Sequence, residues 1–232
     1  MPHSDIKKEL LKFLLDFVSE NKQSKFDEVI RNRTRYITVV LEDIYQSHNA
    51  SAVLRTCECL GIQDVHVIEN AYKYMVNPKV ALGASKYLTI KTYNSENYNT
   101  NNCLAFLRQN GYRIIATTPR NDATLLKDID INKGPIALFF GTEIAGLTDV
   151  ALANADESVH IPIYGLTESY NISVSAALIL YELITRLRQS GIPWNLRLEE
   201  ETEIRIQWAK SIIRKADDLV NAFYKQLDMI VE

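Results

Sequence analysis

The chain holds 232 residues, of which 47% are hydrophobic and 24% charged, and this composition is typical of one soluble globular domain with extensions. A net charge of −3 and a pI near 5.9 argue against a generic nucleic-acid binder, and no apolar run is long enough to span a bilayer. Residues 1–5 lack the layout of a signal peptide, and Cys57, Cys59 and Cys103 form no C-x-x-C pair. We therefore expect a cytoplasmic protein with reduced thiols and without a metal site.

The first predicted element is a helix, followed by a second short helix over 24–32. Together they predict an N-terminal helical extension, residues 1–35. The apolar stripe of the first helix, at helical spacing, consists of Ile6, Leu10, Phe13, Leu14 and Phe17.

Strands and helices then alternate, which predicts an α/β fold with a mostly parallel sheet covered by helices. Several expected strands are continuous apolar runs, which suits strands buried on both faces of a parallel sheet. Gly61 and Gly111 fall just past the ends of helices, where a left-handed residue is favoured. The strands are expected at 36–41, 65–68, 87–92, 113–117, 136–140 and 158–163, and the helices at 50–60, 77–84, 98–109 and 149–155.

The segment 172–187 is apolar almost all round, so this helix must be buried on more than one side. It lies either deep in the fold or against a second subunit. After a break at 191–193, the pattern predicts one last helix, and residues 191–232 are expected to form a C-terminal helical extension. Its apolar stripe contains Ile204, Trp208, Ile212, Leu219, Phe223 and Leu227.

Three polar islands interrupt the apolar middle of the chain, at 49–55, 141–147 and 161–171, and each follows a predicted strand. Ligands of an open parallel sheet gather at such places. In the first island Asn49 is either a helix N-cap or a site residue. Arg55 is either half of a surface ion pair or a residue that binds phosphate or takes part in catalysis.

In the second island, Gly141 allows a close approach of the backbone, and Glu143 is either an acid at the start of a helix or a loop carboxylate that meets a ligand. In the third island, Ser169 and Asn171 both precede a helix and cannot both cap it in the same role. The spare polar residue is a modest indication of function.

Two stretches are basic although the whole chain is acidic, 21–35 and 71–91, and tyrosines are interleaved in the second. Such residues neutralise phosphates and stack on exposed bases, or they only decorate a solvated surface. The residues expected to bind RNA are Arg31, Arg33, Arg35, Lys73, Lys79 and Lys86. No G-x-G-x-x-G follows the first strand, which disfavours a Rossmann dinucleotide site, and no zinc-type Cys/His spacing occurs.

In this order and spacing, the three islands resemble the sequence motifs of the SpoU/TrmH family, RNA ribose 2′-O-methyltransferases with the SPOUT fold. The resemblance covers roughly 36–189 and is nearest to the tRNA guanosine-18 branch. It implies a SPOUT α/β knot domain at 36–190, with a C-terminal trefoil knot that is an exception to the rule against threaded chains. It also implies a homodimer that acts on RNA, most often tRNA.

The resemblance further implies S-adenosyl-L-methionine as the cofactor, held mostly by backbone hydrogen bonds and apolar packing at Thr117, Gly141, Ile161, Ile163 and Tyr170. The implied catalytic residues are Arg55, Asn49, Glu143, Ser169 and Asn171. Because a guanidinium stays protonated at any working pH, we prefer a role for Arg55 in gripping a phosphate and stabilising the alkoxide over a role as general base.

The sequence departs from the family pattern at Tyr170, where Leu is usual, and at Ile163, where Met is common. Neither change removes a polar catalytic position. The expected reaction is 2′-O-methylation of guanosine 18 in the tRNA D-loop. The alternatives are ribosomal RNA or another tRNA position, a non-catalytic RNA-binding dimer, and a small-molecule methyltransferase, which would bind no RNA.

Overall fold

The structure, a computed structural model, describes residues 3–95, 99–120 and 122–231. It consists of two compact units, residues 34–194 and residues 1–33 together with 195–232. The predicted helical extensions 1–35 and 191–232 both contribute to the second unit, in which the first helix packs on the helix that follows residue 197.

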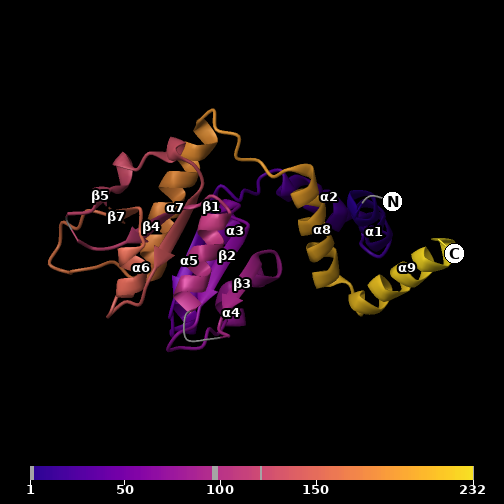
Figure 1. The fold of residues 1–232 in the computed structure, drawn as a ribbon, viewed down its shortest axis with the longest axis horizontal. Coiled ribbons are helices and arrows are strands. Elements are labelled where there is room, and N and C mark those ends of the chain that lie inside the picture. The colour runs from indigo at the N-terminus through magenta and orange to yellow at the C-terminus, as the bar shows by residue number, and fades with distance from the viewer. Residues whose placement is uncertain (1–2, 96–98, 121, 232) are drawn as a thin grey trace. The chain divides into compact units, whose positions relative to one another are not determined.

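The larger unit is an α/β domain built on one seven-stranded sheet in which every recorded strand pair is parallel (Figure 1). The strand order is β3-β2-β1-β6-β4-β7-β5. The strands are β1 (Ile37–Glu42), β2 (Asp64–Ile68), β3 (Thr89–Tyr93), β4 (Arg113–Thr117), β5 (Thr124–Leu125), β6 (Ile136–Phe140) and β7 (Glu157–His160).

Successive residues of the central strands point to opposite faces of the sheet and pack into two separate hydrophobic cores. Helices cover both faces. Leu138 of β6 packs with α3 and α7 on one face, while Phe139 packs with α5 and α6 on the other. The helices of this unit are α3 (Ser47–Leu60), α4 (Pro78–Ala81), α5 (Asn99–Gln109), α6 (Asp149–Ala153) and α7 (Ile172–Gln189), with short 3-10 helices η1 (Ala84–Lys86), η2 (Leu126–Asp128) and η3 (Ile131–Lys133).

The smaller unit is all-helical. Its core contains a fully buried Trp208, whose ring lies 5.3 Å from that of Phe26. Lys7, in the first helix of the chain, pairs at 2.6 Å with Glu203, in the helix Leu198–Ile212. The helices are α1 (His3–Leu15), α2 (Glu20–Ile30), α8 (Leu198–Ile212) and α9 (Ala216–Val231).

Several predicted boundaries differ from the structure. The last predicted helix is two helices, because the backbone turns at Lys215, which has a left-handed φ of 59°. The strand expected at 158–163 ends at His160, since Pro162 has no N–H for the sheet. Strand β5 was not predicted. The first residue of the helix expected at 98–109, Tyr98, lies outside the described residues.

Gly61 and Gly111 have φ values of 82° and 77°, which confirms their predicted places after helices. None of the described helices combines the length and apolar character needed to cross a membrane. Within the same described ranges, no group of His, Cys, Asp or Glu side chains is arranged to hold a metal ion.

Candidate active site

Three segments meet at the carboxyl edge of the sheet, and each carries one of the polar islands: the N-terminal half of α3, the loop after β6 and the loop before α7. Asn49 lies in the first turn of α3, after β1. Glu143 follows β6, the neighbour of β1, and Asn171 precedes α7. Because β1 and β6 are adjacent and the chain continues in opposite directions from them, this edge is the switch point where α/β sheets bind ligands.

The three side chains form one hydrogen-bonded cluster. Asn49 Nδ2 donates to Glu143 Oε1 at 2.9 Å, and Asn171 Nδ2 donates to the same oxygen at 2.5 Å. Asn171 Nδ2 also donates to Asn49 Oδ1 at 3.1 Å. One carboxylate oxygen therefore fixes two amides, while Glu143 Oε2 has no partner in the described part of the chain.

Asn171 has a second task, as the N-cap of α7. Its Oδ1 accepts from the Ser173 backbone N–H at 2.9 Å and from Ser173 Oγ at 2.6 Å. The cap leaves Nδ2 as the end of the amide that faces Glu143. Ser169 does not cap this helix. It is exposed and lines the neighbouring cavity.

Two predicted local roles are wrong. Asn49 is not an N-cap, because α3 begins at Ser47 and Gln46 occupies the N-cap position. Asn49 is 4% exposed, and its amide serves the cluster, with a further bond to Gln46 Oε1 at 2.7 Å. Glu143 does not begin a helix. It lies in a turn that reciprocal backbone bonds of 3.0 Å close between Thr142 and Gly146.

A buried carboxylate that sequence reasoning missed supports the loop that bears Glu143. Glu42, at the end of β1, is 1% exposed. It accepts bonds from the Thr148 N–H and hydroxyl, both at 2.9 Å, and from the Thr100 hydroxyl at 2.6 Å. An acid that ends an otherwise apolar strand was the available signal in the sequence. It anchors the far end of the loop 141–148.

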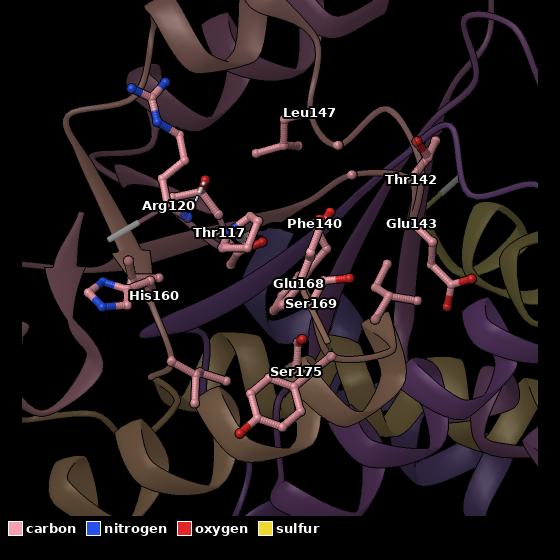
Figure 2. A pocket seen from close by; sticks show the side chains of 18 of the residues that line it. Thr117, Arg120, Phe140, Thr142, Glu143, Leu147, His160, Glu168, Ser169 and Ser175 are labelled. Atoms are coloured by element: carbon pink, nitrogen blue, oxygen red, sulfur yellow. Dashed lines mark hydrogen bonds between the residues drawn. The ribbon is translucent and has the colours of Figure 1, made fainter. Parts of the chain in front are cut away.

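A cavity of about 410 Å³ opens beside the cluster, between the loops that follow β4, β6 and β7 (Figure 2). Figure 2 shows Thr142 and Glu143 on one side of it and Arg120 and His160 on the opposite side. The residues predicted to hold the cofactor all lie in its lining, and they are Thr117, Gly141, Ile161, Ile163 and Tyr170.

The lining is mixed in character. Leu147, Ile161 and Ile163 are apolar, whereas His160 is 6% exposed and its Nδ1 has no hydrogen-bond partner among the residues that the structure describes. Tyr170 donates its hydroxyl to the Pro162 carbonyl oxygen at 3.3 Å, a contact that fixes one end of its ring on the loop after β7. Apolar walls with a few polar groups are typical of small-molecule sites.

Arg55 is exposed, and no hydrogen bond or ion pair engages it within the described ranges. It lies six residues after Asn49 on α3, a rise of about 9 Å and a rotation roughly a third of a turn away. It does not line the cavity of its own chain. Arg55 therefore faces a different direction from the Asn49 cluster.

The face of α3 that carries Arg55 also holds the lysine-bearing segment 77–86. Ser51, one turn before Arg55, is fully buried and accepts from the Asn77 N–H at 2.7 Å. Lys73, Lys79 and Lys86 are exposed, and their ammonium groups form no ion pair among the described residues. Lys79 and Lys86 belong to α4 and η1, which both pack against α3, the helix that carries Arg55.

The three arginines predicted to bind RNA differ in their surroundings. Arg31 is exposed, and Arg35 pairs with Asp64 at 3.0 Å. Arg33 is 1% exposed and its guanidinium lies 5.3 Å from the centre of the Trp208 ring. Arg33 therefore packs in the core of the helical unit, where its guanidinium offers little surface to an RNA phosphate.

Comparison with known proteins identifies the class to which this fold belongs. Residues 36–181 match the model of the SpoU rRNA Methylase family, and the chain belongs to this family. A Borreliella burgdorferi relative named tRNA (guanosine(18)-2'-O)-methyltransferase is 39% identical over 212 residues, which cover 90% of this chain and 95% of the relative. A relative of the same name from Thermus thermophilus is 32% identical, over 79% of this chain and 92% of its own.

A solved structure agrees with these sequence relatives. The TrmH/SpoU tRNA modifying enzyme of A. aeolicus superposes with a TM-score of 0.74 at 26% identity, over 84% of this chain and 98% of that one. The fold described above is therefore the fold of a TrmH/SpoU enzyme.

Proposed function

We propose that the chain transfers a methyl group from S-adenosylmethionine to the ribose 2′-hydroxyl of guanosine 18 in the tRNA D-loop. The relatives named tRNA (guanosine(18)-2'-O)-methyltransferase match 90% and 79% of this chain. The observation that carries the proposal is the cluster of Asn49, Glu143 and Asn171 beside the cavity, since helix α3, the loop after β6 and the N-cap of α7 converge there on one carboxylate.

S-adenosylmethionine, when bound, supplies a methyl group on a positively charged sulfur, and the residues of the cavity suit it. Ile161, Ile163 and Leu147 offer apolar contacts for a flat base. The close approach at Gly141 brings the backbone to the cavity wall, where N–H and C=O groups can bind the edge of an adenine. Tyr170 leaves room for the base because its hydroxyl is bound at Pro162.

Arg55 is assigned to the phosphate beside the target ribose. Its guanidinium has no partner in the described part of the chain, so all of its donors are available for a bidentate phosphate contact. A fixed positive charge there also stabilises the negative charge that develops on the 2′-oxygen during transfer. A guanidinium is a poor proton acceptor, so this role needs no deprotonated arginine.

Glu143 and its two amide partners are assigned to the target hydroxyl. Glu143 Oε1 is saturated by Asn49 and Asn171, which leaves Oε2 to accept a hydrogen bond from the 2′-hydroxyl. Because three hydrogen bonds hold the cluster, this acceptor is in place before RNA arrives. Such preorganisation lets binding energy orient the attacking oxygen rather than order the protein.

We further propose that two copies of the chain form the active enzyme, with the trefoil knot of the family in each and the cytoplasm as its location. One face of α7 is buried in the core, but Val174, Leu178 and Tyr181 on the other face are 45%, 43% and 64% exposed. Their spacing makes one apolar stripe, as an interface requires. Because Arg55 faces away from the cavity of its own chain, the second copy would supply the Arg55 that acts at this cavity.

The decisive experiment is methyl transfer from labelled S-adenosylmethionine to an unmodified tRNA transcript, with mapping of the product. Transfer at guanosine 18 that disappears in Arg55→Ala, and in a transcript with 2′-deoxyguanosine at that position, supports the proposal. Transfer to ribosomal RNA alone, or to another tRNA position, overturns the substrate. Leu178→Glu tests the dimer, since it should yield monomers in sedimentation and abolish transfer.

A further inference from the structure

Two exposed tyrosines form a pair outside the cavity. Tyr45 lies in the loop between β1 and α3, and Tyr72 lies in the loop after β2, the neighbouring strand. Their ring centres are 5.3 Å apart with 45° between the ring planes. The two residues are 46% and 51% exposed, so aromatic surface of both faces solvent.

The backbone beneath this pair is held in place. Asp43 has a left-handed φ of 55° and is 8% exposed. Its Oδ1 accepts from the backbone N–H groups of Asn70, Ala71 and Tyr72, at 2.7, 2.8 and 3.3 Å. One buried carboxylate therefore joins the segment before Tyr45 to the segment that carries Tyr72.

The pair is also connected to the catalytic cluster. Gln46 donates from Nε2 to the Tyr45 hydroxyl at 3.1 Å, and its Oε1 accepts from Asn49 Nδ2 at 2.7 Å. Asn49 in turn donates to Glu143. A single side chain thus separates Tyr45 from the residues assigned to the target hydroxyl.

The charge around the pair suits a polyanion. Lys73 follows Tyr72 directly, is exposed, and forms no ion pair in the described ranges. The two nearby carboxylates are turned inward, because Asp43 binds the N–H groups above and Glu69 accepts from the Tyr74 N–H at 2.8 Å. Aromatic faces beside unpaired lysines are the combination that binds unstacked bases of single-stranded RNA.

We propose that Tyr45 and Tyr72 form a stacking platform for one unpaired base next to the reacting ribose. The proposal rests on the proposed function, since it names how the same site grips its RNA. A loop base held on the platform fixes the local backbone, and the link through Gln46 sets its register relative to Glu143. The platform residues are positioning residues and touch neither cofactor nor reacting atoms.

The first test compares Tyr45→Ala and Tyr72→Ala with Tyr45→Phe and Tyr72→Phe in steady-state methyl transfer to the tRNA transcript. Each alanine variant should raise the KM for tRNA about 10-fold, in keeping with the loss of one base–aromatic stack, while the phenylalanine variants keep most of the affinity. Affinity for S-adenosylmethionine and the thermal midpoint should stay at wild-type values. Tyr224→Ala, an equally exposed tyrosine on α9, serves as the matched control.

The second test locates the base. Transcripts with an abasic residue at one D-loop position at a time are assayed with wild type and with the Tyr45→Ala/Tyr72→Ala double variant. The platform predicts one position at which removal of the base weakens wild-type binding about 10-fold and leaves the double variant unchanged. This non-additivity identifies a direct contact, which a merely structural role of the tyrosines would not produce.

The outcomes separate the two proposals. If the wild-type protein neither binds nor methylates tRNA, both proposals fail. If the protein methylates tRNA but the alanine variants keep a wild-type KM, only the platform is overturned. The same holds if every abasic transcript loses the same affinity for the wild type as for the double variant. A fall of the thermal midpoint that accounts for the lost activity, with no rescue by phenylalanine, also overturns it.

Discussion

The backbone packs so closely around Gly141 that a Cβ atom at this position would clash with it. A Cβ on this residue would lie 2.2 Å from the carbonyl carbon and oxygen of Gly146 and 2.3 Å from the Leu147 nitrogen. All three are backbone atoms, so no side chain can turn aside. Ordinary contact begins at 3.4 Å. Gly141→Ala must therefore push the two ends of the turn apart by about 1 Å or more.

The cost follows from what that turn contains. Two backbone hydrogen bonds of 3.0 Å close it, and each is worth about 1 kcal/mol when lost. We expect a total loss of about 2–3 kcal/mol, and a thermal midpoint lower by about 5–10 °C. Glu143 lies inside the turn, and in its proposed role at the target hydroxyl a shift of about 1 Å should lower the rate roughly 100-fold.

The chain offers a matched control for the assay. A Cβ on Gly165, in the loop that also borders the cavity, would find only Thr167 Oγ1, at 3.9 Å. Gly165→Ala should therefore keep its thermal midpoint and its methyl transfer to tRNA within about 2-fold of wild type. If Gly141→Ala matched wild type in transfer, in calorimetric S-adenosylmethionine affinity and in thermal unfolding, the dependence of Glu143 on this close contact would be refuted.

Three further predictions follow from other contacts. Arg55→Lys keeps the charge without the bidentate geometry, so it should transfer methyl groups measurably faster than Arg55→Ala at saturating tRNA; equal rates would contradict the electrostatic role. Asn171→Asp keeps the oxygen that caps α7 but loses the donor to Glu143, so transfer should fall about 10–100-fold with a near-native thermal midpoint. If the thermal midpoint of Asn171→Asp were as low as that of Asn171→Ala, the Asn171 oxygen would not be what caps α7, and the two separate roles given to its oxygen and nitrogen would be contradicted. Burial and the nearby Lys91 lower the pKa of His66 from 6.5 to about 4, so the unfolded chain binds the extra proton between these values and stability falls as the pH is lowered through them. Between pH 7.5 and pH 5 this loss is about 2 kcal/mol, and His66→Gln should remove it from urea unfolding curves, whereas an unchanged pH dependence would show that His66 is not its source.

The sheet could be predicted from sequence where burial is complete. Every residue of β6 is buried and apolar, so the run Ile136–Phe140 identifies a central strand without any knowledge of its neighbours. Strand β5 has only two half-buried residues, Thr124 and Leu125, too few for any pattern to register. The break between α8 and α9 falls at Lys215, where neither glycine nor proline marks it.

The sequence indicates residues that could form the candidate site, but not how they are arranged in space. Asn49 and Glu143 each have a credible local role at the start of a helix, and local reasoning favours such roles. In the structure these two residues bind each other although they lie 94 residues apart in the sequence, so no short-range pattern contains the contact. The same holds for Arg33, whose burial depends on Trp208, a residue of the opposite end of the chain.

The separation of these partners has a consequence for the newly made protein. Asn49 and Asn171 are 122 residues apart, and Glu143 needs both to hold one oxygen. During synthesis the lysine-bearing segment emerges from the ribosome well before residue 171 does. A chain that has not yet reached residue 171 therefore lacks the complete hydrogen-bonded cluster around Glu143.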